Sequence, residues 1–517
     1  MKRTCALLVT LLPIVPVAVF AATLNQPIQT ESGLIQGVSD PENDVVAFKG
    51  IPYAAPPVGN LRWREPQPAA KWEGIRKAET FGAACTQPAS PSGKEPAEMS
   101  EDCLFLNVWT PAKSATDKLA VLFFIHGGAG LFGSGNMSGE GLAKKGIMVV
   151  TVNYRLGIFA GMGHPELTAE SPHHTCGNYG MLDLIAALQW VRKNIGAFGG
   201  DPGKVTIAGQ SSGACNVHYL MASPLAKGLF RGAIGVSFPY DYLTKPNTIP
   251  FVRQKEENGV VFAQVKKAKL LADLRRIPAL ELIANDPATA KAGLRHLGSG
   301  IARDGWAFPR AYPEALDKGL ESDVPTMTGC TADDFGPPAK YMKTTVASFA
   351  RSMPQMSEEK QKAFLALYPV KTDEDAREMA KRVQNEGMLS SIFYWAERRA
   401  KTAKTPVYTY LFEHVKPNPE HPEKGASHGS DLVYEFNNLK TENLPWSEED
   451  RRVADQVSSY WVNFVKTGNP NGSNLPEWKA FDPHEPSTMY LGKNSGFRPI
   501  AKTKEAWNLL HQKKSAK

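Results

Sequence analysis

The strongest chemical signal in this sequence is a serine between two glycines. Gly209-Gln210-Ser211-Ser212-Gly213 fits the Gly-x-Ser-x-Gly pattern. It lies between an apolar β-type run that ends at Ala208 and a stretch from 212 to about 222 with a helical pattern. A sharp strand-to-helix turn needs glycine on both sides because the backbone is crowded there, and it exposes the serine hydroxyl. Ser211 is therefore the candidate nucleophile.

A serine hydroxyl is a weak nucleophile at neutral pH, so a histidine must remove its proton and a carboxylate must orient that histidine. His428 lies in a turn of small residues, Gly425-Ala426-Ser427-His428-Gly429-Ser430-Asp431, that could present its ring to a pocket. Taken alone, a histidine in such a turn is more often an ordinary surface residue. The expected chain order of serine, acid and histidine makes His428 the candidate base.

Two adjacent acids are the candidates for the carboxylate. Asp333 and Asp334 follow directly after a β-type run from 324 to 328. Adjacent acids after a strand also occur in ordinary solvated loops. We predict Asp334 as the supporting acid and keep Asp333 as the alternative.

The reaction also needs N–H donors for the oxyanion of a tetrahedral intermediate. His126-Gly127-Gly128-Ala129 follows the β-type run from 119 to 125, which is where esterases carry a glycine-rich oxyanion loop. We predict that the amides of Gly128, Ala129 and Ser212 supply these donors.

Two cofactor readings compete with this one. The loop from Gly128 to Gly133 fits the Gly-x-Gly-x-x-Gly pattern of dinucleotide-binding proteins, but Ser-Gly-Asn follows it where such a turn must open a helix. His414, His421 and His428 are spaced by seven in a Pro-containing loop, which resembles no metal ligand set, and the chain has no Cys-x-x-Cys pair. We therefore expect neither a cofactor nor a metal.

The elements that position these residues alternate between strands and helices. Helical periodicity runs through Leu182, Ile185, Leu188, Val191 and Ile195, and buried strands are expected at 119–125, 147–153, 205–208, 233–236, 324–328 and 407–412. Such alternation is typical of a mostly parallel sheet with helices on both faces. Charged helical stretches at about 240–318 and 348–402 are expected insertions over this sheet. Without repeats or a Gly/Ser-rich linker, residues 22–517 are expected to form a single catalytic domain.

The first residues have the character of a secretory signal peptide. Lys2 and Arg3 precede an apolar stretch from 6 to about 22 that ends in small residues, which predicts cleavage after Ala21. The stretch is short for a membrane span and contains Pro13 and Pro16, so a membrane anchor is disfavoured. We expect a secreted or periplasmic protein.

Composition is that of a globular chain, with 42% hydrophobic and 21% charged residues. The formal net charge of +7 is spread along the chain, apart from a basic C-terminal tail, so we expect no nucleic-acid partner. Five cysteines remain after removal of the segment that contains Cys5, and an odd number leaves at least one free thiol.

Nearly the whole of the predicted mature chain resembles the type-B carboxylesterase family, which includes bacterial para-nitrobenzyl esterases, animal carboxylesterases and cholinesterases. The matching segments occur in the family's order: 48–54, 56–59, 100–104, 153–157, 177–180, 198–202, the Ser211 turn, 460–464 and 467–470. The resemblance implies an α/β-hydrolase fold, the roles given above to Ser211, His428 and Asp334, and the oxyanion loop. It also implies a disulfide between Cys85 and Cys103, and the other thiols are expected to be buried small residues.

Four departures from the family pattern concern substrate and mechanism. Asp334 followed by Phe335 replaces the usual Glu-Gly, Gly130 replaces a common aromatic, and Gln210 replaces a frequent acid. The loop between Cys85 and Cys103 contains no Trp, Tyr or Phe, so the cation-binding tryptophan of cholinesterases has no counterpart.

We therefore predict a serine hydrolase of small neutral carboxylic esters that works through an acyl-enzyme without a cofactor. The alternative is a binding or adhesion module of the kind that keeps this fold without catalysis. The sequence leaves the oligomeric state and the natural ester open.

Overall fold

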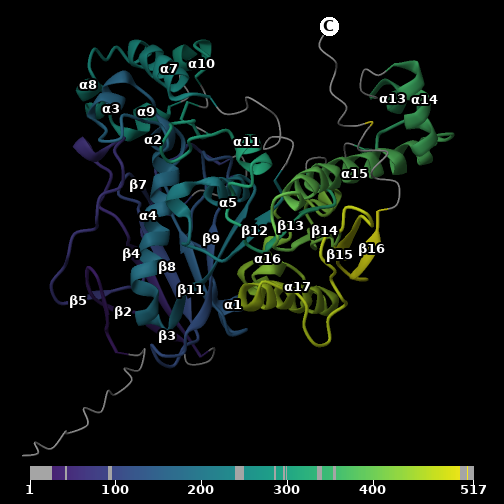
Figure 1. The fold of residues 1–517 in the computed structure, drawn as a ribbon, viewed down its shortest axis with the longest axis horizontal. Helices are drawn as coiled ribbons and strands as arrows, with labels where there is room; N and C mark the ends of the chain where they lie inside the picture. Colours follow the sequence, from purple (N-terminus) through teal and green to yellow (C-terminus); the bar gives the residue numbers. More distant parts are fainter. Residues whose placement is uncertain are drawn as a thin grey trace, which may run out of the picture.

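A computed structural model describes residues 26–40, 44–90, 93, 96–238, 250–284, 287–294, 297–298, 300–334, 341–352, 357–500 and 509. The predicted signal segment and Phe335 lie outside these residues. A large sheet runs through the centre of the molecule (Figure 1). In spatial order its strands are β16 (Gly496–Pro499), β15 (Ser487–Leu491), β14 (Val407–Phe412), β13 (Thr326–Thr331), β12 (Gly232–Val236), β11 (Gly200–Gln210), β9 (Leu119–Ile125), β10 (Met148–Val152), β8 (Phe105–Thr110), β4 (Val45–Pro52) and β3 (Val38–Asp40).

In this spatial order, all pairs from β15 through β9 to β10 are parallel. The pair of β16 with β15 is antiparallel, and so are the successive pairs of β10, β8, β4 and β3 at the other side. All six predicted strands are present, with small shifts at their ends. The antiparallel strands β3, β4, β8, β15 and β16 were not predicted as strands. Parts of β4 and β8 lie in or beside segments that the sequence marked only as family motifs, and edge strands carry a weaker apolar signal than buried ones.

The side chains of β9 show why this sheet needs cover on both faces. Val121, Phe123 and Ile125 belong to one core cluster, whereas Leu122 and Phe124 belong to another. Successive side chains of a strand point to opposite faces, and here both faces are apolar. The strand therefore requires a layer of helices on each side.

Those layers come from different parts of the chain. The first core cluster contains apolar side chains of α4 (Tyr179–Asn194), α5 (Ser212–Ala222) and α15 (Asp373–Ala400), and the second contains those of α1 (Glu140–Ala143), α16 (Leu432–Glu435) and α17 (Glu448–Thr467). The predicted α/β-hydrolase fold, with a mostly parallel sheet and helices on both faces, is confirmed.

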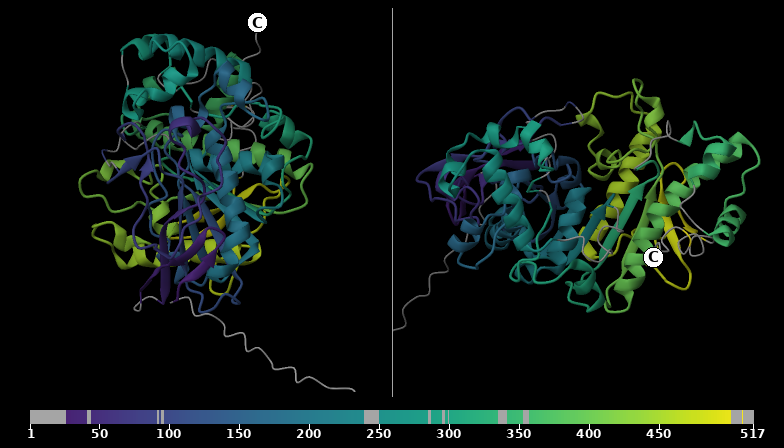
Figure 2. Two further views of the ribbon diagram at one scale, coloured as in Figure 1. Left: turned by 90° about the vertical axis from the view of Figure 1, so that its left-hand side faces the viewer. Right: turned by 90° about the horizontal axis from the view of Figure 1, so that it is seen from above.

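The remaining elements surround this framework. Both predicted insertions are helical, and their outer helices lie on different sides of the molecule in the right-hand view of Figure 2, although Tyr312 of the first insertion contacts Trp395 of the second. The first contains α7 (Val252–Val265), α8 (Leu271–Arg276), α9 (Ala279–Ile283), α10 (Pro287–Lys291) and α11 (Tyr312–Asp317), and the second contains α13 (Val346–Ser352), α14 (Glu358–Leu367) and α15. Smaller elements are β1 (Ile28–Thr30), β2 (Gly33–Gln36), β5 (Ile75–Lys77), β6 (Ala84–Cys85), β7 (Met99–Ser100), α2 (Gly157–Gly161) and α3 (Pro165–Glu170). None of the described helices combines the length and the apolar sequence that a bilayer span requires.

Candidate active site

Ser211 occupies a strained turn between β11 and α5. Its backbone angles are φ 56° and ψ −122°, a conformation that costs energy for any residue with a side chain. A Cβ on Gly209 would lie 2.4 Å from the carbonyl carbon of Gly213, and one on Gly213 would lie 2.2 Å from the Ile125 carbonyl oxygen. Both glycines are therefore needed for the turn that raises the serine above the sheet.

The glycine loop after β9 packs directly against this turn. A Cβ on Gly127 would lie 3.0 Å from that of Ser211, and one on Gly128 would lie 1.9 Å from the Phe132 carbonyl oxygen. Gly128 and Ala129 have φ values of 109° and 56°. Within the part of the chain that the structure describes, the amides of both residues donate to no protein acceptor. The loop thus presents unpaired N–H groups beside the serine.

Two aromatic residues fix this loop from behind. The rings of His126 and Tyr154 stack with centroids 4.6 Å apart, and the Tyr154 hydroxyl donates to the His126 carbonyl at 2.9 Å. Burial lowers the pKa of His126 to about 4, so its ring is neutral at neutral pH. His126 Nδ1 lies 2.8 Å from the Gly127 carbonyl and, because that oxygen can only accept, Nδ1 carries the proton.

The second half of the site joins two loops that lie far apart in the sequence. His428 Nδ1 is hydrogen-bonded to Asp334 Oδ1, and the two residues are 94 positions apart. The Asp334 side chain is 1% exposed, whereas that of His428 is 32% exposed. The Thr331 amide donates to the other Asp334 oxygen at 3.1 Å. The acid is therefore buried and fixed, while the imidazole remains accessible.

Asp333, the alternative acid, makes different contacts. One of its carboxylate oxygens accepts from the Tyr341 hydroxyl at 2.7 Å, and the other accepts from the Ala426 amide at 2.8 Å. Its own amide donates to the Ala426 carbonyl at 2.9 Å. Of the two acids, Asp334 is thus the one that contacts His428, and Asp333 ties the acid loop to the histidine loop.

The environment of His428 favours its protonated form. Burial lowers the pKa of the imidazole, but the hydrogen bond to Asp334 and the charges of Asp334 and Asp431 outweigh it, so the pKa is raised. In the neutral ring with its proton on Nδ1, Nε2 carries a lone pair and acts as an acceptor. Gln210 Nε2 lies 3.1 Å from His428 Nε2, so the amide donates to this lone pair.

Sequence reasoning missed two features of this site. It noted that Gln210 lacks the charge of an acid but not that its side chain reaches His428. It also placed Asp431 in the histidine turn without assigning it a role. Only the tertiary structure brings these side chains to the imidazole, so no local sequence pattern marks them.

The residues of the two competing cofactor patterns have separate surroundings in this structure. His414 contacts Asp450 at 2.8 Å and His421 contacts Glu423 at 3.1 Å, so the two histidines have different partners from His428. No group of three or more His, Cys, Asp or Glu among the described residues is arranged to hold a metal. No helix opens after Gly133 until α1.

The cysteines pair as the resemblance implied. Cys85 and Cys103 form a disulfide across a sequence separation of 18 residues. Cys176, Cys215 and Cys330 are free, and burial raises the pKa of each thiol. None of the three is therefore an activated thiolate at neutral pH.

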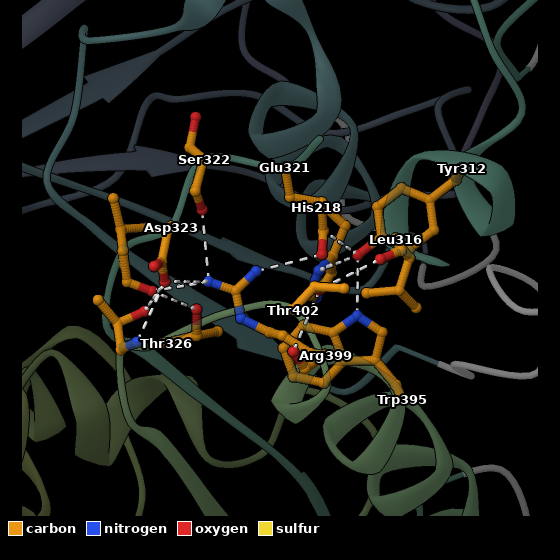
Figure 3. Close-up of polar contacts among 12 residues, drawn as sticks. His218, Tyr312, Leu316, Glu321, Ser322, Asp323, Thr326, Trp395, Arg399 and Thr402 are labelled. Carbon is orange, nitrogen blue, oxygen red and sulfur yellow. Dashed lines mark hydrogen bonds and ion pairs between the residues drawn. The ribbon is translucent and has the colours of Figure 1, made fainter. Parts of the chain in front are cut away.

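A buried polar network anchors the helix that starts at Ser211 (Figure 3). The Tyr312 hydroxyl donates to Glu321 at 2.5 Å and accepts from Trp395 Nε1 at 2.8 Å. His218 Nδ1, on α5, lies 3.3 Å from the same hydroxyl and must donate to it, because the hydroxyl's single proton is used. Arg399 then binds the other Glu321 oxygen at 3.1 Å. Both insertions are thereby fixed to α5.

Comparison with known proteins identifies the family of this chain. The model of the "Carboxylesterase family" matches residues 25–507. The chain belongs to the carboxylesterase family. Among its relatives are a fumonisin B1 esterase of Sphingopyxis macrogoltabida, 31% identical over 466 residues (88% of this chain, 84% of that protein), and a para-nitrobenzyl esterase of Bacillus subtilis (strain 168), 32% identical over 493 residues (90% and 95%).

Solved structures of other carboxylesterases support the same family assignment. A structure titled "PNB esterase" has a TM-score of 0.74 at 28% identity and covers 94% of this chain and 100% of its own. A Geobacillus stearothermophilus carboxylesterase has a TM-score of 0.75 at 30% identity, with coverage of 93% and 99%. This carboxylesterase-family chain is a carboxylic ester hydrolase, and the serine mechanism is characteristic of its family.

Proposed function

We propose that Ser211, His428 and Asp334 form the catalytic triad of this esterase, with Ser211 as nucleophile, His428 as general base and Asp334 as the supporting acid. The observation that carries the proposal is the hydrogen bond from His428 Nδ1 to the buried Asp334 carboxylate, in a structure that also holds Ser211 in a strained strand-to-helix turn. Asp334 fixes the tautomer whose Nε2 can accept a proton. Asp333, which contacts the backbone of Ala426, is assigned a positioning role.

The proposed reaction has two steps. Ser211 Oγ attacks the ester carbonyl while His428 Nε2 takes its proton, and the protonated imidazole then gives that proton to the leaving alcohol. Water attacks the resulting acyl-enzyme in the second step with the same histidine as base. The unpaired amides of Gly128 and Ala129, with that of Ser212, would bind the oxyanion in both steps.

The proposed substrates are small neutral carboxylic esters. The names of the relatives refer to different esters, including fumonisin B1, para-nitrobenzyl esters and cocaine, so the family relationship alone selects none of them. Choline esters are excluded from the proposal because the segment between Cys85 and Cys103 has no aromatic side chain to bind a quaternary cation. A nucleic-acid partner and a membrane anchor form no part of it.

The proposed location is outside the cytoplasm. Removal of residues 1–21 as a signal peptide would leave residues 22–517 as one catalytic domain, secreted or periplasmic. The disulfide between Cys85 and Cys103 supports this proposal because such bonds persist in oxidising compartments.

The first test compares the mature protein with its Ser211→Ala variant on chromogenic esters of increasing acyl length. We expect turnover by the wild-type protein and loss of nearly all of it in the variant. Equal activity of the two proteins would contradict the role of Ser211. An inactive wild-type protein that still binds esters would favour the alternative of a binding module.

A further inference from the structure

Two buried carboxylates follow the proposed base in the chain and take no part in the steps above. Asp431 precedes the short helix α16 and Glu435 ends it, and the Glu435 amide donates to the Asp431 carbonyl at 2.9 Å. Residues four positions apart on a helix lie on the same side of it. Asp431 is 0% exposed and Glu435 is 1% exposed. The two acids are thus neighbours in the protein interior.

This pair has very few hydrogen-bond donors. Glu435 Oε1 accepts from the Tyr410 hydroxyl at 3.0 Å. Among the residues that the structure describes, Glu435 Oε2 and both carboxylate oxygens of Asp431 have no hydrogen-bond partner, and neither acid forms an ion pair with a lysine or arginine. An ionised carboxylate in such a place is costly.

Four other titratable groups act electrostatically on the pair. His428 lies on the same loop, Asp334 follows β13, Cys330 lies on β13, and the remaining group, Tyr410, lies on β14. Of these groups only His428 can carry a positive charge, and it is already bonded to Asp334. The single positive charge of a protonated His428 cannot neutralise Asp334, Asp431 and Glu435 if all three are ionised.

Burial and like charge therefore favour protonation within the pair. Burial, followed by the charge of Asp334, raises the pKa of Asp431 to about 7. Burial, followed by the charge of Asp431, raises the pKa of Glu435 well above its usual range. Two neighbouring buried carboxylates resist simultaneous ionisation.

We propose that Asp431 and Glu435 hold one proton between them, carried by Glu435, and that the ionised Asp431 acts with Asp334 to stabilise the protonated imidazole of His428. Both would be positioning residues, because neither touches the substrate. The part that concerns His428 rests on its proposed role as the base. Since Gln210 is neutral, the negative charge that supports the imidazolium would then come from Asp334, at Nδ1, and from Asp431.

The protonation state can be observed without any substrate. Infrared difference spectroscopy of the wild-type protein against Glu435→Gln at neutral pH should show the carbonyl stretch of a protonated carboxyl group in the wild-type protein only. The Asp431→Asn variant should keep this band, shifted in frequency by the changed hydrogen bonding. A difference spectrum without the band would overturn the proposal, because Glu435 would then be ionised.

The effect on His428 is measured by the pH dependence of kcat/KM. Asp431→Asn should shift the acid limb to lower pH, because the imidazole loses a negative neighbour. Glu435→Gln mimics the protonated acid, so the acid limb of its kcat/KM profile should lie at the same pH as that of the wild-type protein. Glu435→Leu should have a lower thermal midpoint than the wild-type protein. Equal shifts in Asp431→Asn and Glu435→Gln would contradict the assignment of the proton to Glu435.

These readouts separate the two proposals. If Ser211→Ala keeps full activity, the triad assignment fails, yet the infrared band still reports whether the pair shares a proton. If the triad assignment stands and the band is absent, only the carboxylate pair is refuted. Near-ultraviolet circular dichroism of each variant checks that it is folded.

Discussion

The side-chain amide of Gln210 lies 3.1 Å from Nε2 of His428, the ring atom that would take the proton of Ser211. The nucleophile's own neighbour in the sequence thus occupies the lone pair of the proposed base. For proton transfer to occur, Ser211 must replace this amide as the donor to Nε2.

A Gln210→Glu substitution should change the pH dependence of catalysis. A carboxylate would accept a hydrogen bond from the protonated Nε2 and stabilise the imidazolium, so the pKa of His428 would rise further. We expect the acid limb of the kcat/KM profile to move to higher pH. Gln210→Met, which has a similar size and neither the amide donor nor a carboxylate, is the control, and its acid limb should move upward by less than that of Gln210→Glu. An unchanged limb in Gln210→Glu would contradict the contact.

The two adjacent aspartates should respond differently to substitution. Asp334→Asn permits the wrong tautomer of His428 and should lower kcat by about 10³–10⁴-fold with little loss of stability. Asp333→Ala removes the acceptor of the Ala426 amide and should lower the free energy of unfolding by about 1–3 kcal/mol. Steady-state kinetics and thermal unfolding of both variants check this contrast. A larger kcat defect in Asp333→Ala would reverse the assignment.

Tyr312→Phe should destabilise the protein because it removes only the hydroxyl at the centre of the network in Figure 3. Trp395 Nε1 and Glu321 Oε1 would each lose a buried partner. We expect a loss of about 1–3 kcal/mol, which a lower thermal midpoint would reveal. Tyr408→Phe, which removes a hydroxyl from a buried tyrosine of β14 that forms no side-chain hydrogen bond among the described residues, is the matched control and should have a smaller effect.

Lys255 should make stability depend on alkaline pH. This lysine is 6% exposed, and its ammonium donates to the carbonyls of Gly300, Gly177 and Gly161 at 2.7, 3.2 and 3.3 Å. Burial lowers its pKa to about 8, whereas a lysine in the unfolded chain has a pKa of about 10.4. Between these values the unfolded state binds more protons, so the contribution of Lys255 to stability rises with pH.

The measurement is the thermal midpoint of the wild-type protein and Lys255→Met across this alkaline window. Lys255→Met leaves three carbonyls without their donor, so its midpoint should be lower throughout. The gap between the two proteins should widen as pH rises through the window. A gap that narrows instead would show that the folded state holds the proton more tightly than the unfolded chain.

Much of this arrangement could be predicted from local sequence. Apolar runs predicted the parallel strands, since a strand buried on both faces is hydrophobic throughout, and the glycines around Ser211 predicted the turn. The choice between Asp333 and Asp334 could not be predicted, because both side chains reach the histidine loop and only the tertiary structure shows that Asp333 meets the Ala426 amide while Asp334 meets the imidazole. The Gln210 contact depends likewise on how β11 and the histidine loop meet in space.

The bond between Asp333 and Ala426 has a consequence for how this enzyme can be altered. A parallel bridge also pairs Asp333 with Ser427, so acid and base belong to one cross-linked unit although 94 positions separate them in the chain. Residues 342–388 can therefore change in composition while the hydrogen bond between Asp334 and His428 is kept, because Tyr341, Trp395 and Arg399 lie outside this range. Directed evolution confined to these residues offers a route to new ester specificities that leaves the chemical machinery in place.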